Sequence, residues 1–89
     1  MSDAPWRIRV TPTAHRQLRK LPERYATAAV ELLPAIAANP KRLGKPLRFE
    51  LDGRWAARRG PYRVIYALDA KARTVVVLTV AHRADAYRR

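Results

Sequence analysis

The sequence predicts an α+β fold in which two N-terminal helices pack on one face of a small, mainly antiparallel twisted sheet. Three observations support this: an apolar period of two near the N-terminus, two segments with helical apolar spacing, and strand-like runs joined by short turns. The expected order is β-α-α-β-β-β. The helices must bury their apolar stripes against the sheet, so its other face stays open. Residues 1–89 are expected to form one domain.

The first strand and the first helix are predicted from residues 6–22. Apolar residues alternate with arginines over residues 6–10, the pattern of a half-buried strand. Thr11 can then cap a helix whose first residue is Pro12. Proline suits the first helical position because a backbone N–H there would have no partner within the helix. Pro22 ends this helix.

A second helix is expected to begin at Glu23 or Arg24 and to end at Asn39-Pro40. Pro34 interrupts it: either the helix stops near Leu32 and a short turn restarts at Pro34, or the helix continues with a kink at this proline, and we expect the second. Its predicted apolar stripe consists of Ala26, Ala29, Val30, Leu33 and Ala37.

The C-terminal half contains three strand-like runs, preceded by a run over residues 47–52 that is either a short strand or an extended segment. Turn signals separate them, among them Asp52-Gly53 and Gly60-Pro61. The last run is the most apolar and is predicted to be a central strand that is buried on both faces. The four runs are residues 47–52, 54–59, 62–69 and 74–81.

Side-chain parity predicts which residues share a face of this sheet. Successive side chains of a strand point to opposite faces, so His82 and Arg83 point apart if the last strand is regular. The small side chains of Thr79 and Ala81 suit the open face, and Arg83 shares their parity. We therefore expect Arg83, rather than His82, to meet Arg63 there.

The charge of the chain points to a polyanionic partner. Nineteen Lys and Arg residues against seven Asp and Glu give a net charge of +12. The chain has no cysteine, so it has neither disulfides nor a thiolate metal site. No apolar run is long enough to span a membrane and no signal peptide is evident, which predicts a cytoplasmic protein.

Familiar enzyme motifs are absent, but the cations allow cleavage of RNA. The chain has no glycine-rich phosphate loop and no nucleophile elbow. RNA carries its own nucleophile, the 2′-hydroxyl, so fixed guanidinium groups with a proton donor and acceptor can cleave it without a metal or cofactor. Candidates for the proton transfers are His82, Tyr87 or an arginine in an unusual environment. A basic rim would add salt-dependent affinity for phosphates; its candidates are Lys45, Arg48, Arg54, Arg58 and Arg59.

Three segments together resemble the RelE-type toxins of the RelE/ParE toxin–antitoxin superfamily. They are Leu-Asp-Gly-Arg-Trp at 51–55, Arg-Arg-Gly-Pro-Tyr-Arg-Val-Ile-Tyr at 58–66 and Ala-His-Arg-Ala-Asp-Ala-Tyr at 81–87, preceded by Gly-Lys-Pro-Leu at 44–47. The resemblance covers nearly the whole chain and includes the order of its elements.

The resemblance implies an activity and roles for several residues. Such toxins are small, basic, metal-independent endoribonucleases that cleave messenger RNA in the ribosomal A site and are neutralised by a cognate antitoxin in a hetero-oligomer. Arg63 matches the arginine that contacts the scissile phosphate, and Arg83 the position that stabilises charge or transfers a proton. Tyr87 matches the C-terminal aromatic residue. Ala56 departs from the pattern where some members have a lysine, which makes His82 a candidate base.

Two other functions remain open. A ParE-like inhibitor of DNA gyrase would have the same fold and would cleave no RNA, and Ala56 is compatible with it. A basic RNA-binding module without catalysis is the third possibility. The ending from Arg83 to Tyr87 favours the nuclease.

Overall fold

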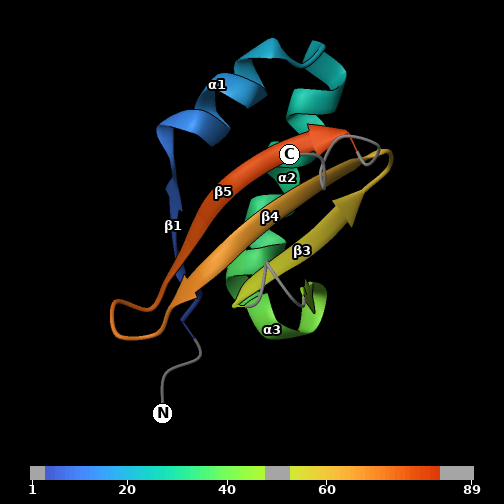
Figure 1. Cartoon of the computed structure of the whole chain (residues 1–89). Helices are drawn as coiled ribbons and strands as arrows, with labels where there is room; N and C mark the ends of the chain where they lie inside the picture. Colours follow the sequence, from blue (N-terminus) through green and yellow to red (C-terminus); the bar gives the residue numbers. More distant parts are fainter. Residues whose placement is uncertain (1–3, 48–52, 83–89) are drawn as a thin grey trace.

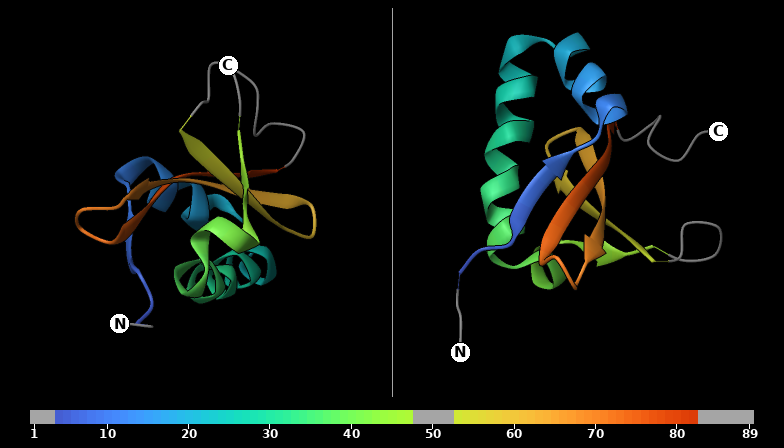
Figure 2. Two further views of the ribbon diagram at one scale, coloured as in Figure 1. Left: turned by 90° about the horizontal axis from the view of Figure 1, so that it is seen from below. Right: turned by 90° about the vertical axis from the view of Figure 1, so that its left-hand side faces the viewer.

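One five-stranded sheet carries the helices on a single face (Figures 1 and 2). The computed structural model describes residues 4–47 and 53–82. The elements in chain order are β1 (Arg7–Val10), α1 (Pro12–Lys20), α2 (Glu23–Ala38), α3 (Pro40–Leu43), β2 (Lys45–Pro46), β3 (Arg54–Arg59), β4 (Tyr62–Asp69) and β5 (Thr74–His82).

The strand order across the sheet is β1-β5-β4-β3-β2. β1 pairs with β5 in parallel, and the other three pairings are antiparallel. The α+β prediction with a mainly antiparallel sheet is confirmed. Two short elements, α3 and β2, were not predicted, because four and two residues give no readable periodicity.

The local start and stop signals of the helices are confirmed. The Thr11 side chain accepts a hydrogen bond of 3.2 Å from the Ala14 N–H, and Pro12 is the first residue of α1. α2 begins at Glu23 and continues through Pro34 to Ala38.

The predicted apolar stripe of α2 was wrong in part. Leu32 and Ile36 are buried, whereas Val30 is 49% exposed. Ala29, Leu32 and Ile36 recur at intervals of three and four, so they form a stripe as regular as the predicted one. Spacing alone does not choose between neighbouring stripes of a largely apolar helix.

The hairpin of β3 and β4 turns at Gly60 and Pro61. Arg59 pairs with Tyr62, so the turn has two residues, and Gly60 has φ 57. A positive φ at the first turn residue matches the right-handed twist of a hairpin and favours glycine there.

A bulge in β5 changes which residues face the helices. Ile65 pairs with Thr79 but the next residue, Tyr66, pairs with Val77, so Leu78 is an extra residue in β5. Val77 is therefore buried together with Val80 on the helix-covered face. A regular strand, as the parity argument assumes, would place Val77 on the face of Thr79, so that argument does not hold on the N-terminal side of the bulge.

β5 is an interior strand between β1 and β4. Val75, Val77 and Val80 are fully buried, while Val76 and Leu78 are half-buried. The prediction of burial on both faces is therefore confirmed for the face toward the helices, and the other face is buried only in part. The predicted strand at 47–52 lies mostly outside the described residues; its first residue, Leu47, donates a backbone hydrogen bond to Arg54.

Within the described ranges, no helix is long and apolar enough to cross a membrane.

Candidate functional site

A cleft of about 440 Å³ opens on the face of the sheet that the helices leave free. We call it the hairpin cleft. Ala57 and Val64 are buried toward the helices, so their strand neighbours Arg58 and Arg63 point to the opposite face. The cleft is lined by Leu43, Lys45, Leu47, Ala56, Arg58 and Arg63.

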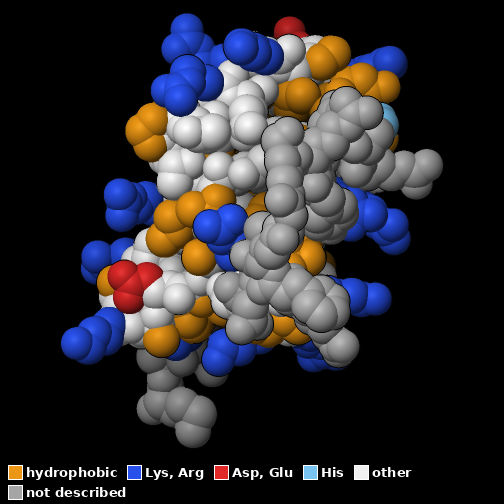
Figure 3. Space-filling view, viewed as in Figure 1, with side chains coloured by type: hydrophobic (Ala, Val, Ile, Leu, Met, Phe, Trp, Pro, Cys, Tyr) orange, Lys and Arg blue, Asp and Glu red, His pale blue; other side chains and the backbone are white. Residues whose placement is uncertain are grey.

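Three cations meet in the hairpin cleft, and none of its lining residues in the described ranges is acidic. Arg58 and Arg63 are direct cross-strand partners. Like charges at directly opposite positions destabilise a sheet, and a bound anion would relieve that repulsion. Seen from this side, Lys and Arg side chains surround the molecule and few acidic side chains appear (Figure 3). The arrangement is therefore suited to an anionic ligand such as a phosphodiester.

Arg63 occupies the innermost position of the three cations. It lies on β4, the central strand, with Ala81 of β5 as its partner on the other side. Its residue is half-buried, whereas Arg58 and Lys45 are exposed. A partly desolvated guanidinium attracts an anion more strongly than one surrounded by water. The register also confirms that Arg63 shares its face with Ala81 and Thr79.

The other predicted residues of the described ranges lie apart from the cleft. Arg54 is on the same face of β3 but at its far end, paired with Ala67. Arg59 points to the opposite face, where its Nη2 lies 3.9 Å from Oε1 of Glu31 on α2. This pair is exposed, so it adds little stability.

His82 also lies on the face opposite Arg63. It pairs with Tyr62, and the two rings meet edge to face with centroids 5.6 Å apart. The Tyr62 ring in turn lies 5.1 Å from that of Tyr25 on α2. This aromatic cluster holds His82 away from the hairpin cleft. Arg48, Arg83 and Tyr87 lie outside the described residues.

Tyr66 fixes the wall of the hairpin cleft. Its ring is fully buried under the sheet, and its hydroxyl donates a 2.5 Å hydrogen bond to the Pro40 carbonyl at the start of α3. A Cβ on Gly44 would lie 2.1 Å from the same hydroxyl oxygen. Tyr66 therefore anchors the segment that carries Leu43 and Lys45 into the cleft. The sequence did not reveal this role, because the bond joins residues 26 positions apart.

The Tyr66 phenol gives the stability of the fold a dependence on alkaline pH. Burial raises the pKa of Tyr66 to about 12, and a backbone hydrogen bond from Gly44 opposes this in part. In the unfolded chain the tyrosine pKa is about 10. Between these values the unfolded chain loses the proton while the folded chain keeps it.

We therefore expect this contribution to be fully present below pH 10 and to be lost as the pH rises to about 12. The free energy of unfolding should fall by about 2–3 kcal/mol over this window. Urea titrations at pH 9 and pH 11.5 would measure it. In Tyr66→Phe the free energy of unfolding should fall less over the same pH range, because the contribution of the Tyr66 phenol is missing. An equally large fall in this variant would show that the phenol is not its source.

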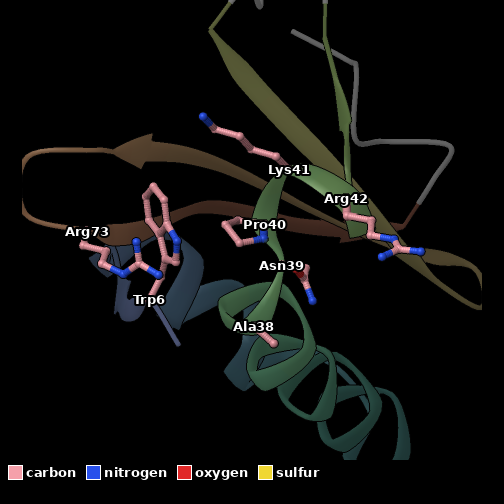
Figure 4. Close-up of a pocket in the computed structure, with 7 residues that line it drawn as sticks. All are labelled: Trp6, Ala38, Asn39, Pro40, Lys41, Arg42 and Arg73. Atoms are coloured by element: carbon pink, nitrogen blue, oxygen red, sulfur yellow. The ribbon is translucent and has the colours of Figure 1, made fainter. Parts of the chain in front are cut away.

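A second hollow, which the sequence did not predict, lies near the N-terminal end of β1 (Figure 4). We call it the Trp6 pocket. Its volume is about 630 Å³, and it is lined by Trp6, Ala38, Asn39, Pro40, Lys41, Arg42 and Arg73. The alternation over residues 6–10 predicts for Trp6 only a position on the first strand. The pairing of β1 with β5 places Arg73, in the turn before β5, beside Trp6, and the sequence does not predict this pairing.

Comparisons with known proteins place this chain in a family. The model of the ParE toxin of the type II toxin–antitoxin system parDE matches residues 8–87. Toxin RelG of Mycobacterium tuberculosis (strain ATCC 25618 / H37Rv) is 51% identical over 86 residues, covering 96% of this chain and 99% of the relative. Toxin RelE of the same strain is 46% identical over 87 residues, covering 97% and 90%.

Solved structures agree with the sequence comparisons. The toxin–antitoxin complex RelBE2 from Mycobacterium tuberculosis contains a chain with a TM-score of 0.87 and 48% identity, covering 94% of this chain and 98% of that chain. The isolated E. coli RelE toxin has a TM-score of 0.74 at 16% identity, covering 86% and 83%, which shows the common fold. This chain therefore belongs to the RelE/ParE superfamily of toxins of type II toxin–antitoxin systems.

Proposed function

We propose that this toxin is a metal-independent endoribonuclease that cleaves messenger RNA in the ribosomal A site and so blocks translation. The observation that carries the proposal is the hairpin cleft, where Lys45, Arg58 and Arg63 surround one hollow and no acid is found among the lining residues that the structure describes. The identity with toxins named RelG and RelE supports the same activity class.

In this mechanism the chain supplies charge and position while RNA supplies the nucleophile. Arg63 holds the scissile phosphate, and Arg58 on the neighbouring strand adds a second guanidinium. The charge that builds on phosphorus during attack by the 2′-hydroxyl is thereby stabilised. We propose Arg83 and Tyr87 for charge stabilisation and proton transfer. His82 faces the helices instead, so we assign it no step in the cleft.

Lys45 supplies the cation that Ala56 does not. The two residues are direct cross-strand partners, and both line the hairpin cleft. Opposite side chains of a strand pair have Cβ atoms about 5 Å apart, so the Lys45 ammonium can reach the space above Ala56.

We expect Lys45→Ala to lower the cleavage rate about 10- to 100-fold, and Ala56→Lys in the same protein to restore part of it. Lys20→Ala, at the end of α1, is the matched control for loss of one charge. Rates on programmed ribosomes would measure these effects. If Ala56→Lys gives no recovery, the cation is not required at this place.

The second candidate function is inhibition of DNA gyrase without RNA cleavage. Two observations favour it: the matching family model describes ParE toxins, and Ala56 departs from the RelE pattern. The same basic cleft would then contact an acidic protein surface or DNA.

One pair of assays separates the two candidates. Purified toxin is added to programmed ribosomes, with cleavage mapped by primer extension, and in parallel to a gyrase supercoiling reaction. We expect cleavage within the A-site codon and unaffected supercoiling. Intact messenger together with blocked supercoiling would replace the nuclease with the gyrase inhibitor.

We further propose that a cognate antitoxin neutralises this toxin in a cytoplasmic hetero-oligomer. The matching chain from Mycobacterium tuberculosis was solved in a toxin–antitoxin complex, as was a RelE–RelB complex from Pyrococcus horikoshii OT3. The net charge of +12 also favours a partner that carries acidic segments.

A further inference from the structure

The Trp6 pocket combines three cations with an aromatic ring. Lys41, Arg42 and Arg73 line it, and its lining includes no acid from the part of the chain that the structure describes. Its volume of about 630 Å³ is in the range of small-molecule sites and would hold a nucleotide. Figure 4 shows Trp6 and Arg73 on one side of the pocket and the α3 residues Pro40 and Lys41 on the other.

The Trp6 pocket and the hairpin cleft are the two ends of a series of hollows around α3 that share lining residues. Arg42 lines both the Trp6 pocket and a smaller hollow that includes Leu43. Leu43 in turn lines the hairpin cleft. Three hollows therefore adjoin along one short helix, and basic side chains occur from one end of this path to the other. A flexible, negatively charged chain that leaves the cleft can follow it.

Trp6 and Arg73 offer flat groups at the end of this path. The Arg73 guanidinium lies over the Trp6 ring, 5.3 Å from its centroid, and its Nη2 donates a 3.0 Å hydrogen bond to the Ala4 carbonyl. Indole rings and guanidinium planes are the groups on which unpaired bases stack, whatever their sequence. An acidic peptide would use the three charges but has no need for a stacked pair of flat groups.

The backbone conformation of Arg73 is strained for a residue that has a side chain. Arg73 has φ 49, the one positive φ at a non-glycine residue among those described. Glycine would adopt this conformation without strain, whereas an L side chain there is disfavoured. In Arg73→Gly the relief of the strained backbone offsets part of what is lost with the side-chain contacts to Trp6 and Ala4, while the cation is removed.

We propose that the Trp6 pocket binds the part of a single-stranded RNA that extends beyond the hairpin cleft. One base stacks on Trp6 or Arg73, and the adjoining phosphates contact Lys41 and Arg42. This inference rests on the proposed RNA substrate and adds a second contact at a distance from the chemistry. It predicts that affinity depends on RNA length, since a short strand fills the hairpin cleft alone.

The test uses 2′-O-methyl oligonucleotides, which cannot be cleaved, about 4 and about 12 residues long. Fluorescence anisotropy would give their affinities for Lys41→Ala combined with Arg73→Gly. We expect the longer strand to bind about tenfold more weakly and its salt slope to fall by about 0.7, for the one phosphate contact that Lys41 makes, with little change for the short strand. In the matched control, Lys71→Ala removes a cation from the same turn without touching the pocket.

Emission from Trp6 in a Trp55→Phe protein gives a second readout. Quenching by the longer strand and not by the short one supports stacking in the pocket. An equal loss of affinity in the Lys71→Ala control, or no loss in the pocket variant, would overturn the proposal. Variant-sensitive binding of poly-glutamate in place of the longer strand would also overturn it and identify an acidic-peptide site.

These outcomes are separate from those of the ribosome assay. Length-dependent binding without cleavage would remove the proposed nuclease activity and leave the RNA contact in place. Cleavage without length-dependent binding would contradict only the proposal that the Trp6 pocket binds RNA and would leave the proposed nuclease activity in place.

Discussion

Arg63→Ala should lower messenger RNA cleavage on programmed ribosomes by at least 100-fold while leaving the fold intact. The Arg63 guanidinium lies on the central strand of the sheet and enters the hairpin cleft between Arg58 and Ala81. Removing one preorganised group that stabilises transition-state charge typically costs a factor of about 100 to 1,000 in rate. Growth arrest on expression should disappear together with cleavage.

The same hairpin offers the matched control. Arg59→Ala removes an identical charge from β3, but Arg59 points to the helix-covered face, beside Glu31. We expect its cleavage rate to stay within about threefold of the unchanged protein, because its exposed ion pair contributes little to stability. Arg63→Lys should fall between the two, since an ammonium keeps the charge and loses bidentate contact with a phosphate.

Two results would contradict this role. If Arg63→Ala lowers the midpoint of thermal unfolding as well as antitoxin binding, Arg63 is structural. If Arg59→Ala loses as much activity as Arg63→Ala, the effect depends on net charge and not on the hairpin cleft. Circular dichroism and co-purification with the antitoxin, run beside the cleavage assay, distinguish these cases.

The sequence predicted those parts of the fold that depend on neighbouring residues. Thr11 and Pro12 begin α1 because a cap and a first-turn proline act locally. The alternation in β3 places Arg58 and Arg59 on opposite faces, whereas a basic rim predicted from residue type alone includes both. The structure brings Lys45, Arg58 and Arg63 together and separates Arg59 from them.

Long-range contacts explain what the sequence did not predict. The extra residue Leu78 is recognisable only from the pairing of β4 with β5, and it reverses the face of Val77. The Trp6 pocket requires Arg73 to reach a residue far away in sequence. In the same way, nothing local to Gly44 shows that a ring from β4 occupies the space beside it.

Gly44→Ala should therefore destabilise the fold by about 1–3 kcal/mol or more, through overpacking alone. Gly44 has φ −94 and ψ 172, which alanine adopts freely, so the backbone makes no contribution. The new methyl would lie 2.1 Å from the Tyr66 hydroxyl oxygen and 2.9 Å from its ring carbon Cζ. Urea denaturation would measure the loss, and cleavage should fall in parallel because Leu43 and Lys45 line the cleft.

Tyr66→Phe provides the internal control for this prediction. Alone, it removes the hydrogen bond to the buried Pro40 residue and should cost about 1–3 kcal/mol. In the double variant the 2.1 Å contact disappears while the 2.9 Å contact remains. The loss of stability in the double variant should therefore be smaller than the sum of the losses in the two single variants. Simple additivity would show that Gly44 is needed for a reason other than the Tyr66 ring. A coupling of about 0.5–3 kcal/mol would show that one phenol holds both α3 and the wall of the hairpin cleft in place.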